Sequence, residues 1–174
     1  MGAVAEELEN RATWAAHVVV LPLPAHGHVN PMLHLATRLA ADDGFTITFV
    51  NSEADGPMLN KMSGSRIRFL EIPDGLPADV DRTTRVIDLC KSMMTDMASH
   101  FHRLIGRLME EGGTVGTRPT CIIADIWLSP FTIETAATFG LSHISFWTQS
   151  AASFASLHAI TANGYCPLPQ GELS

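Results

Sequence analysis

Short apolar runs rich in β-branched residues alternate along this chain with segments whose apolar residues recur every three or four positions. The first run, His17–Leu21, is continuous rather than alternating, which is typical of a strand buried on both faces of a sheet. Further strands are predicted at Phe45–Val50, Arg66–Ile72, Cys121–Ile126 and His143–Thr148. Strands that alternate with helices predict an α/β fold: a doubly wound, Rossmann-like parallel sheet in the common strand order 3-2-1-4-5.

The segments between the strands carry the start and stop signals of helices. Asn30 is a suitable N-cap and Pro31 suits the first helical position, so the first helix is predicted to begin there. Further helices are predicted over Thr84–Glu110, between Ser129 and Gly140, and over Ala151–Ala162. Apolar residues of the longest helix recur in steps of three and four, which predicts that one of its faces is buried.

The composition is that of one folded domain without a polyanion-binding surface. With 174 residues the chain can bury a core, and 46% apolar and 17% charged residues exclude disorder. The net charge of −7 disfavours binding to nucleic acids or anionic membranes, which attract basic surfaces. Cys90, Cys121 and Cys166 are too scattered for a disulfide framework or a zinc cluster. We expect buried, reduced thiols in a cytoplasmic protein.

Two segments without charged residues, Ala12–Thr37 and Thr135–Gly171, are the candidates for a membrane span. Proline and glycine interrupt the first, and glycine with many hydroxyl residues interrupts the second, so we expect neither to span a membrane. The first sixteen residues contain three glutamates, the wrong charge for a signal peptide. They are expected to form an N-terminal tail.

Candidate catalytic residues follow two strands that the predicted order makes neighbours. Ligands of doubly wound sheets bind beyond the carboxyl ends of the strands, where the strand order reverses. His28 follows the first strand, and Asp125 lies at the end of the fourth. A lone carboxylate in so apolar a segment must be paired, and an Asp–His pair suits a general base. Alternatively, Asp125 only caps a turn and His28 only holds the loop.

Other types of site fit the sequence less well. The GxGxxG fingerprint of dinucleotide-binding proteins and the GxSxG motif of serine hydrolases are both absent. His26 and His28 could chelate a metal, but no further ligands have suitable spacing, so we expect no metal site. Trp127 directly follows the fourth predicted strand, and Phe146 and Trp147 lie near the end of the fifth. The three aromatic residues could stack on a planar ligand or serve as packing.

Five ordered segments resemble the N-terminal part of plant-type UDP-dependent family 1 glycosyltransferases. They are HVVVLPLPAHGHVNPMLHLATRLA (His17–Ala40), EIPDGLP (Glu71–Pro77), IIADIW (Ile122–Trp127), FWTQSA (Phe146–Ala151) and NGYCPLP (Asn163–Pro169). The resemblance implies one half of the GT-B architecture, in which two Rossmann-like domains face each other across a cleft. The N-terminal domain of such enzymes binds the acceptor, often a flavonoid, phenolic, terpenoid or hormone, and the C-terminal domain binds the UDP-sugar.

The resemblance also implies roles for individual residues. His28 matches the catalytic base and Asp125 its carboxylate partner. Thr148 matches a residue that contacts the donor sugar or phosphate, and Gly27 lies where the backbone approaches the donor. The implied reaction inverts the anomeric configuration and needs no metal or other cofactor, and Trp127, Phe146 and Trp147 are assigned to acceptor binding.

The chain departs from the family pattern in lacking the donor-binding box with its HCGWNS-like residues. We expect an acceptor-binding domain over residues 17–165 and the start of an interdomain linker over 166–174, without the C-terminal donor-binding domain. The chain alone is then expected to be inactive, and UDP-glucose would be bound by the missing domain. The alternative is a non-catalytic, half-length domain of the same fold that binds small molecules or has a regulatory role.

Overall fold

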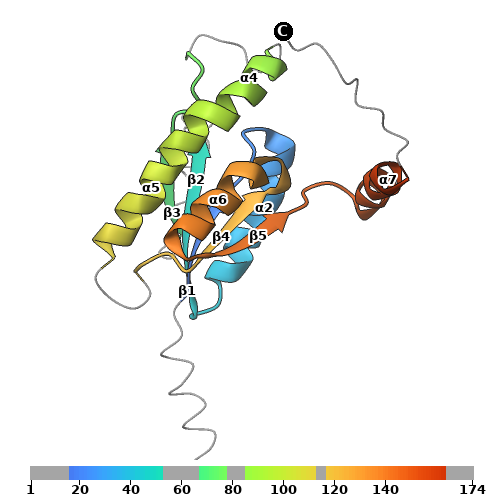
Figure 1. Ribbon diagram of the computed structural model, residues 1–174. Helices are drawn as coiled ribbons and strands as arrows, with labels where there is room; N and C mark the ends of the chain where they lie inside the picture. The colour runs from blue at the N-terminus through green and yellow to red at the C-terminus, as the bar shows by residue number, and fades with distance from the viewer. Residues whose placement is uncertain (1–15, 53–66, 78–84, 113–116, 164–174) are drawn as a thin grey trace, which may run out of the picture.

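Five parallel strands form the sheet, and their order confirms the expected doubly wound topology. The computed structural model describes residues 16–52, 67–77, 85–112 and 117–163 (Figure 1). The strands are β1 (Ala16–Leu21), β2 (Phe45–Ser52), β3 (Ile67–Ile72), β4 (Cys121–Asp125) and β5 (Ser142–Phe146). They lie in the order β3-β2-β1-β4-β5, all paired in parallel. The valines of β1 are buried because helices cover both faces of this central strand.

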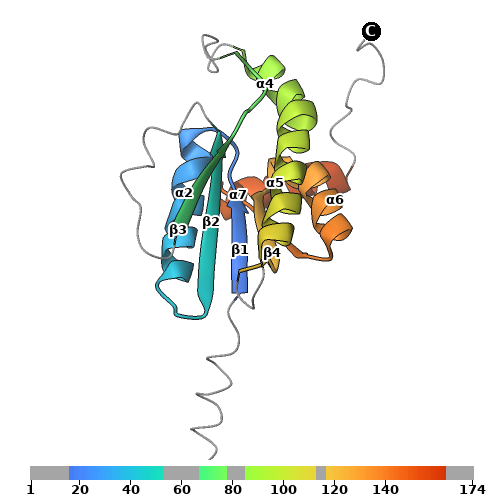
Figure 2. The same cartoon turned by 90° about the vertical axis from the view of Figure 1, so that its left-hand side faces the viewer.

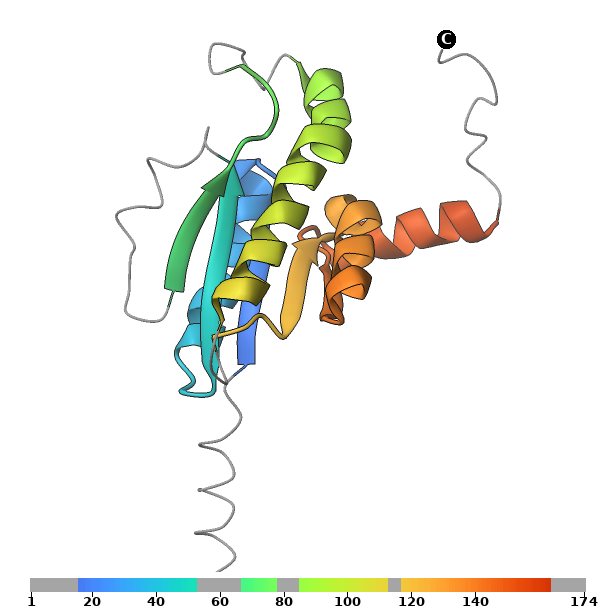
Figure 3. The ribbon, with the colours of Figure 1, turned by 60° about the vertical axis from the view of Figure 1, so that its left-hand side comes forward.

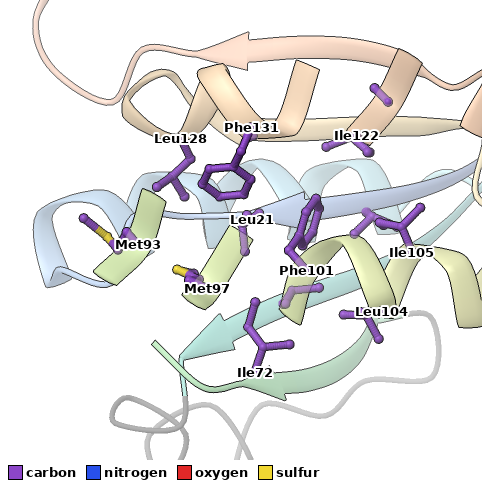
Figure 4. Packing of buried hydrophobic residues seen from close by; sticks show 14 of the residues in the cluster. Leu21, Ile72, Met93, Met97, Phe101, Leu104, Ile105, Ile122, Leu128 and Phe131 are labelled. Carbon is purple, nitrogen blue, oxygen red and sulfur yellow. The ribbon is translucent and has the colours of Figure 1, made fainter. Parts of the chain in front are cut away.

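Helices on the two faces of the sheet create two apolar clusters (Figure 2). Helix α2 (His26–Ala40) covers one face. The other is covered by α4 (Val86–Ser92), the π-helical turn η2 (Met93–Met97), α5 (Ala98–Glu111) and α6 (Ser129–Phe139). Met93, Met97 and Phe101 of the long helix lie in this cluster (Figure 4), so burial of one helix face is confirmed. Cys90, which belongs to the same apolar repeat in the sequence, is exposed.

The first helix begins five residues earlier than the sequence predicts. Its N-cap is Ala25, and Pro31 lies inside the helix. Proline there removes one backbone donor, whereas burial of Val29 and Met32 against the sheet favours helical geometry from His26 onward. His28 is therefore held by the first helical turn and does not belong to a free loop.

The long predicted helix is present, with a π-helical turn at its middle. Ser92, just before that turn, donates a hydrogen bond from its hydroxyl to the carbonyl oxygen of Asp74, at 2.8 Å. Asp74 belongs to the loop after β3 at the carboxyl edge of the sheet, and the next residue, Gly75, has a φ of +83°. The glycine thus permits a tight approach between this loop and the helix.

Helix α7 (Ala151–Ala162) projects sideways from the sheet and its covering helices (Figure 3). None of its residues is buried, and Phe154, Leu157 and Ile160 are exposed. No helix of the described residues has both the length and the apolar character needed to cross a membrane. Residues 1–15 of the proposed tail and the whole proposed linker lie outside the described residues, whereas Ala16 is the first residue of β1.

His17, the second residue of β1, is a buried histidine whose ring makes two hydrogen bonds. Its ring donates from Nδ1 to the carbonyl oxygen of Thr117 at 2.8 Å, and Nε2 accepts from the Thr48 hydroxyl at 2.7 Å. Burial lowers the pKa of His17 below its ordinary value of 6.5. The hydrogen bond to the Thr117 carbonyl acts in the opposite direction but is the smaller effect, and the nearby Arg68 charge lowers the pKa further. The neutral ring is therefore the form that the fold accommodates.

We expect the His17 contribution to be complete above about pH 6.5 and to fall at lower pH, because the unfolded chain then binds the proton more readily. Urea unfolding at pH 7.5 and pH 5 should show a smaller pH-dependent loss for His17→Gln than for the wild type. The same measurement on His143→Gln gives the effect of replacing a second histidine, because burial lowers the pKa of His143 as well. Equal loss in the wild type and His17→Gln would refute the assignment.

Candidate active site

His28 reaches the carboxyl edge of the sheet from the first turn of α2. The chain leaves β1 at Leu21 and enters the helix at His26. The carbonyl oxygen of Ala25 accepts the backbone N–H groups of His28 and Val29, which fixes this turn. Val29 is buried beneath it, whereas the His28 side chain keeps 16% of its surface exposed. The ring can therefore meet both a buried partner and a ligand.

Asp125 ends β4 beside that turn and is fully buried. Because β1 and β4 pair in parallel with Leu21 opposite Ala124, the residues that follow each strand meet at one edge. One carboxylate oxygen, Oδ1, accepts the backbone N–H of Trp127 at 3.1 Å. The other, Oδ2, lies 2.7 Å from His28 Nδ1. The pairing predicted from strand order is thus present.

This geometry defines the protonation of the imidazole. An ionised carboxylate only accepts hydrogen bonds, so the close Nδ1–Oδ2 contact requires the proton to be on His28 Nδ1. In the neutral ring Nε2 then carries a lone pair and no proton. A histidine held in this form can accept a proton from a hydroxyl group at Nε2.

Thr148 joins the same pair of side chains from the segment that follows β5. The strand ends at Phe146, two residues before the predicted end, so Thr148 lies in the connection to α7. Its Oγ1 is 2.8 Å from His28 Nδ1 and 3.3 Å from Asp125 Oδ2. The family resemblance implies a donor contact for Thr148 but not these two contacts, because spacing along the chain does not show where its side chain points.

The other proposed site residues differ in accessibility. Gly27, next to His28, is exposed, and a Cβ placed there would meet no atom within 4 Å. Trp127 is 49% exposed beside the buried Asp125. A ligand could thus approach both the backbone of Gly27 and the indole of Trp127.

Phe146 and Trp147 make contacts within the protein. Phe146 is partly buried and packs against the cluster beneath α2. Trp147 meets the ring of Phe154 edge-on, with centroids 5.3 Å apart, and its Nε1 donates to the carbonyl oxygen of Ser150. Packing therefore accounts for part of the surface of both aromatic residues.

No cluster of three or more His, Cys, Asp or Glu side chains suited to a metal ion occurs within the described ranges. His26 is exposed at the helix start, and the recorded partners of His28 Nδ1 are Asp125 and Thr148. In the residues that the structure describes, His28 thus belongs to a carboxylate–imidazole–hydroxyl arrangement.

Comparison with known proteins points to one family. Residues 15–57 match a family model described as "Glycosyltransferase, N-terminal domain". The 7-deoxyloganetin glucosyltransferase of Gardenia jasminoides is 40% identical over 146 residues, which cover 79% of this chain and 30% of that protein. The (R)-mandelonitrile beta-glucosyltransferase of Prunus dulcis is 38% identical over 143 residues, which cover 78% and 29%.

A solved structure has the same arrangement of strands and helices. Arabidopsis thaliana UGT89C1 complexed with UDP gives a TM-score of 0.68 at 21% identity, over 83% of this chain and 39% of that one. This likeness concerns the fold alone and supports the doubly wound α/β architecture. The present chain spans about 30% of the length of the two glucosyltransferases that it resembles.

Proposed function

Because the chain is a homologue of the N-terminal region of plant UDP-dependent glycosyltransferases, with the fold of one GT-B half, we propose that it supplies the acceptor site and the base of a sugar transfer. The observation that carries the proposal is the 2.7 Å contact between His28 Nδ1 and the buried Asp125 carboxylate. It leaves His28 Nε2 available as the proton acceptor.

In this reaction His28 Nε2 removes the proton of an acceptor hydroxyl. The acceptor oxygen attacks the anomeric carbon of the UDP-sugar, on the face opposite UDP. A bond forms between that oxygen and the carbon, the bond from the carbon to the UDP oxygen breaks, and the anomeric configuration inverts. Asp125 orients the imidazole and stabilises its protonated form after the transfer.

Substrate contacts are proposed for the accessible groups around the base. Trp127 offers an exposed indole to the acceptor, with Phe146 and Trp147 beside the same edge. Gly27 and Thr148 would meet the donor, which a second domain would hold. No metal is proposed to take part, and the reaction is assigned to the cytoplasm.

The acceptor is proposed to be a small lipophilic compound with a hydroxyl group, and the donor UDP-glucose. The two relatives are named for glucosylation of 7-deoxyloganetin and of (R)-mandelonitrile. A flavonoid or another phenolic of plant secondary metabolism belongs to the same broad class. The exposed Trp127 favours acceptors with a flat apolar part.

The test joins residues 1–163 to the region of the Gardenia glucosyltransferase that follows its matching segment. With UDP-glucose and a panel of phenolic and terpenoid alcohols, the fused protein should form a β-glucoside from the α-linked donor. A folded fusion that binds both substrates and transfers no sugar would favour a non-catalytic binding function.

Asp125→Asn should keep the fold and lower turnover of the fused protein at least about tenfold, because an amide can also donate and no longer fixes the proton on Nδ1. Steady-state rates and circular dichroism measure the two effects. EDTA should leave the wild-type rate unchanged. If EDTA abolished activity and added divalent metal restored it, Asp125 would be assigned as a metal ligand instead.

A further inference from the structure

Strand β5 forms an open edge of the sheet. Within the described part of the chain its only strand neighbour is β4, with which it pairs in parallel. The N–H of Ser142 donates to the carbonyl oxygen of Thr120, the residue before β4. Because successive residues of a strand turn their backbone groups to opposite sides, the N–H and C=O groups of His143 and Ser145 face outward. A further strand could pair with them.

The side chains of β5 leave the same edge accessible. Ser142, Ile144 and Ser145 are exposed, and Ile144 keeps 51% of its surface. The strands of a parallel sheet are normally covered on both faces, as the buried valines of β1 are here. Helix α7 follows β5 but projects away from the other helices, and it does not cover the strand (Figure 3).

The two edges of the sheet differ in charge. At the opposite edge β3 carries exposed Arg68 and Glu71, and charged side chains on an edge strand hinder its pairing with other strands. Neither β5 nor α7 contains Asp, Glu, Lys or Arg. Two copies of a chain with a net charge of −7 repel each other. The β5 edge is a surface where they can meet without placing like charges together.

The register of β5 fits pairing with an identical strand about a two-fold axis at Ile144. Such an axis makes the two strands antiparallel. His143 then lies opposite Ser145 of the second copy, and the two outward-facing residues exchange both backbone hydrogen bonds. Ile144 meets its own copy in the non-hydrogen-bonded pair, where side chains approach most closely. The outward backbone groups and the exposed isoleucine are thereby satisfied together.

We propose that β5 is a self-association surface at which two copies of this chain pair edge to edge, with Ile144 on the two-fold axis. The two five-stranded sheets become one continuous sheet. A single strand pair is a small interface, so we expect a Kd of roughly 10⁻⁵ M. The inference concerns the chain by itself and does not rest on the proposed function.

Sedimentation velocity of the 174-residue chain between about 1 and 200 µM tests the proposal. We expect the mass to rise from that of one chain toward that of two. Ile144→Lys places two ammonium groups opposite each other on the axis and should weaken the dimer at least about tenfold. The matched control is Ile133→Lys on α6, because Ile133 is also 51% exposed. It should associate like the wild type.

A mixture of Ile144→Lys and Ile144→Glu tests the axis itself. Each variant alone should stay monomeric at concentrations where the wild type pairs. The mixture should regain dimers, because opposite charges then face each other across the axis. Circular dichroism checks that the variants fold. If Ile144→Lys does not fold, Ser145→Pro removes one outward N–H donor instead, at an edge position where proline is tolerated.

Three results would overturn the proposal. A wild-type chain that stays monomeric up to about 200 µM would leave β5 to a strand of another protein or of another segment. Dimers that survive Ile144→Lys would form through a different surface, such as α7. A mixture of the two charged variants that stays monomeric would contradict the two-fold register. None of these results bears on sugar transfer by the fused protein, which is measured separately.

Discussion

Replacing His28 with alanine is expected to lower turnover of the fused protein at least about 10²-fold, the lower range for loss of a general base. The imidazole is the group whose free nitrogen can take the acceptor proton, and its orientation depends on the buried Asp125. Alanine suits the first turn of a helix, so the fold should persist. Initial rates with saturating UDP-glucose measure the effect.

The matched control is His34→Ala, an exposed histidine later in the same helix. It should retain wild-type turnover, because it lies outside the proposed site. The acceptor KM should change far less than kcat in His28→Ala if the base acts mainly in the transition state. A His28→Ala enzyme with near wild-type turnover at neutral pH would remove His28 from the role of base.

Gly75→Ala is expected to destabilise the domain by about 2–6 kcal/mol, since backbone strain and overpacking each cost roughly 1–3 kcal/mol. Its φ of +83° is unfavourable for any residue with a Cβ. That Cβ would lie 2.1 Å from the Ser92 hydroxyl oxygen and 2.6 Å from Cβ of Asp96. The Ser92 hydrogen bond to the Asp74 carbonyl would have to shift or break.

Urea unfolding followed by circular dichroism measures this change in the free energy of unfolding. Gly106→Ala, inside α5, is the control. Its added Cβ would lie 3.4 Å from the ring of Phe139, and alanine favours helix, so its stability should equal or exceed that of the wild type. If Gly75→Ala unfolds within about 0.5 kcal/mol of the wild type, the loop and helix are less tightly packed than described.

The sheet was predictable because its signals are local and agree with one another. The continuous β-branched run of β1 marks a central strand, and the alternation with helices favours a doubly wound sheet, of which the observed strand order is a common one. The start of α2 was predicted wrongly from Asn30 and Pro31. Burial of the preceding turn against the sheet outweighs the capping signal, which a single sequence does not reveal.

The dyad was predictable for a related reason. Strand order makes the ends of β1 and β4 neighbours, so His28 and Asp125 could be paired across 97 positions of sequence. The contacts of Thr148 and the packing of Trp147 against Phe154 could not be predicted in this way. Both depend on where β5 ends and on side-chain directions in the connection that follows it.

The central claim is that Asp125 holds the proton of His28 on Nδ1 and leaves Nε2 free to act as a base. Nitrogen-15 NMR of the imidazole in the 174-residue chain measures this directly, at a pH where the ring is neutral. We predict a protonated Nδ1 and an unprotonated Nε2, with the preference reduced in Asp125→Asn. A neutral ring protonated on Nε2 in the wild type would contradict the account.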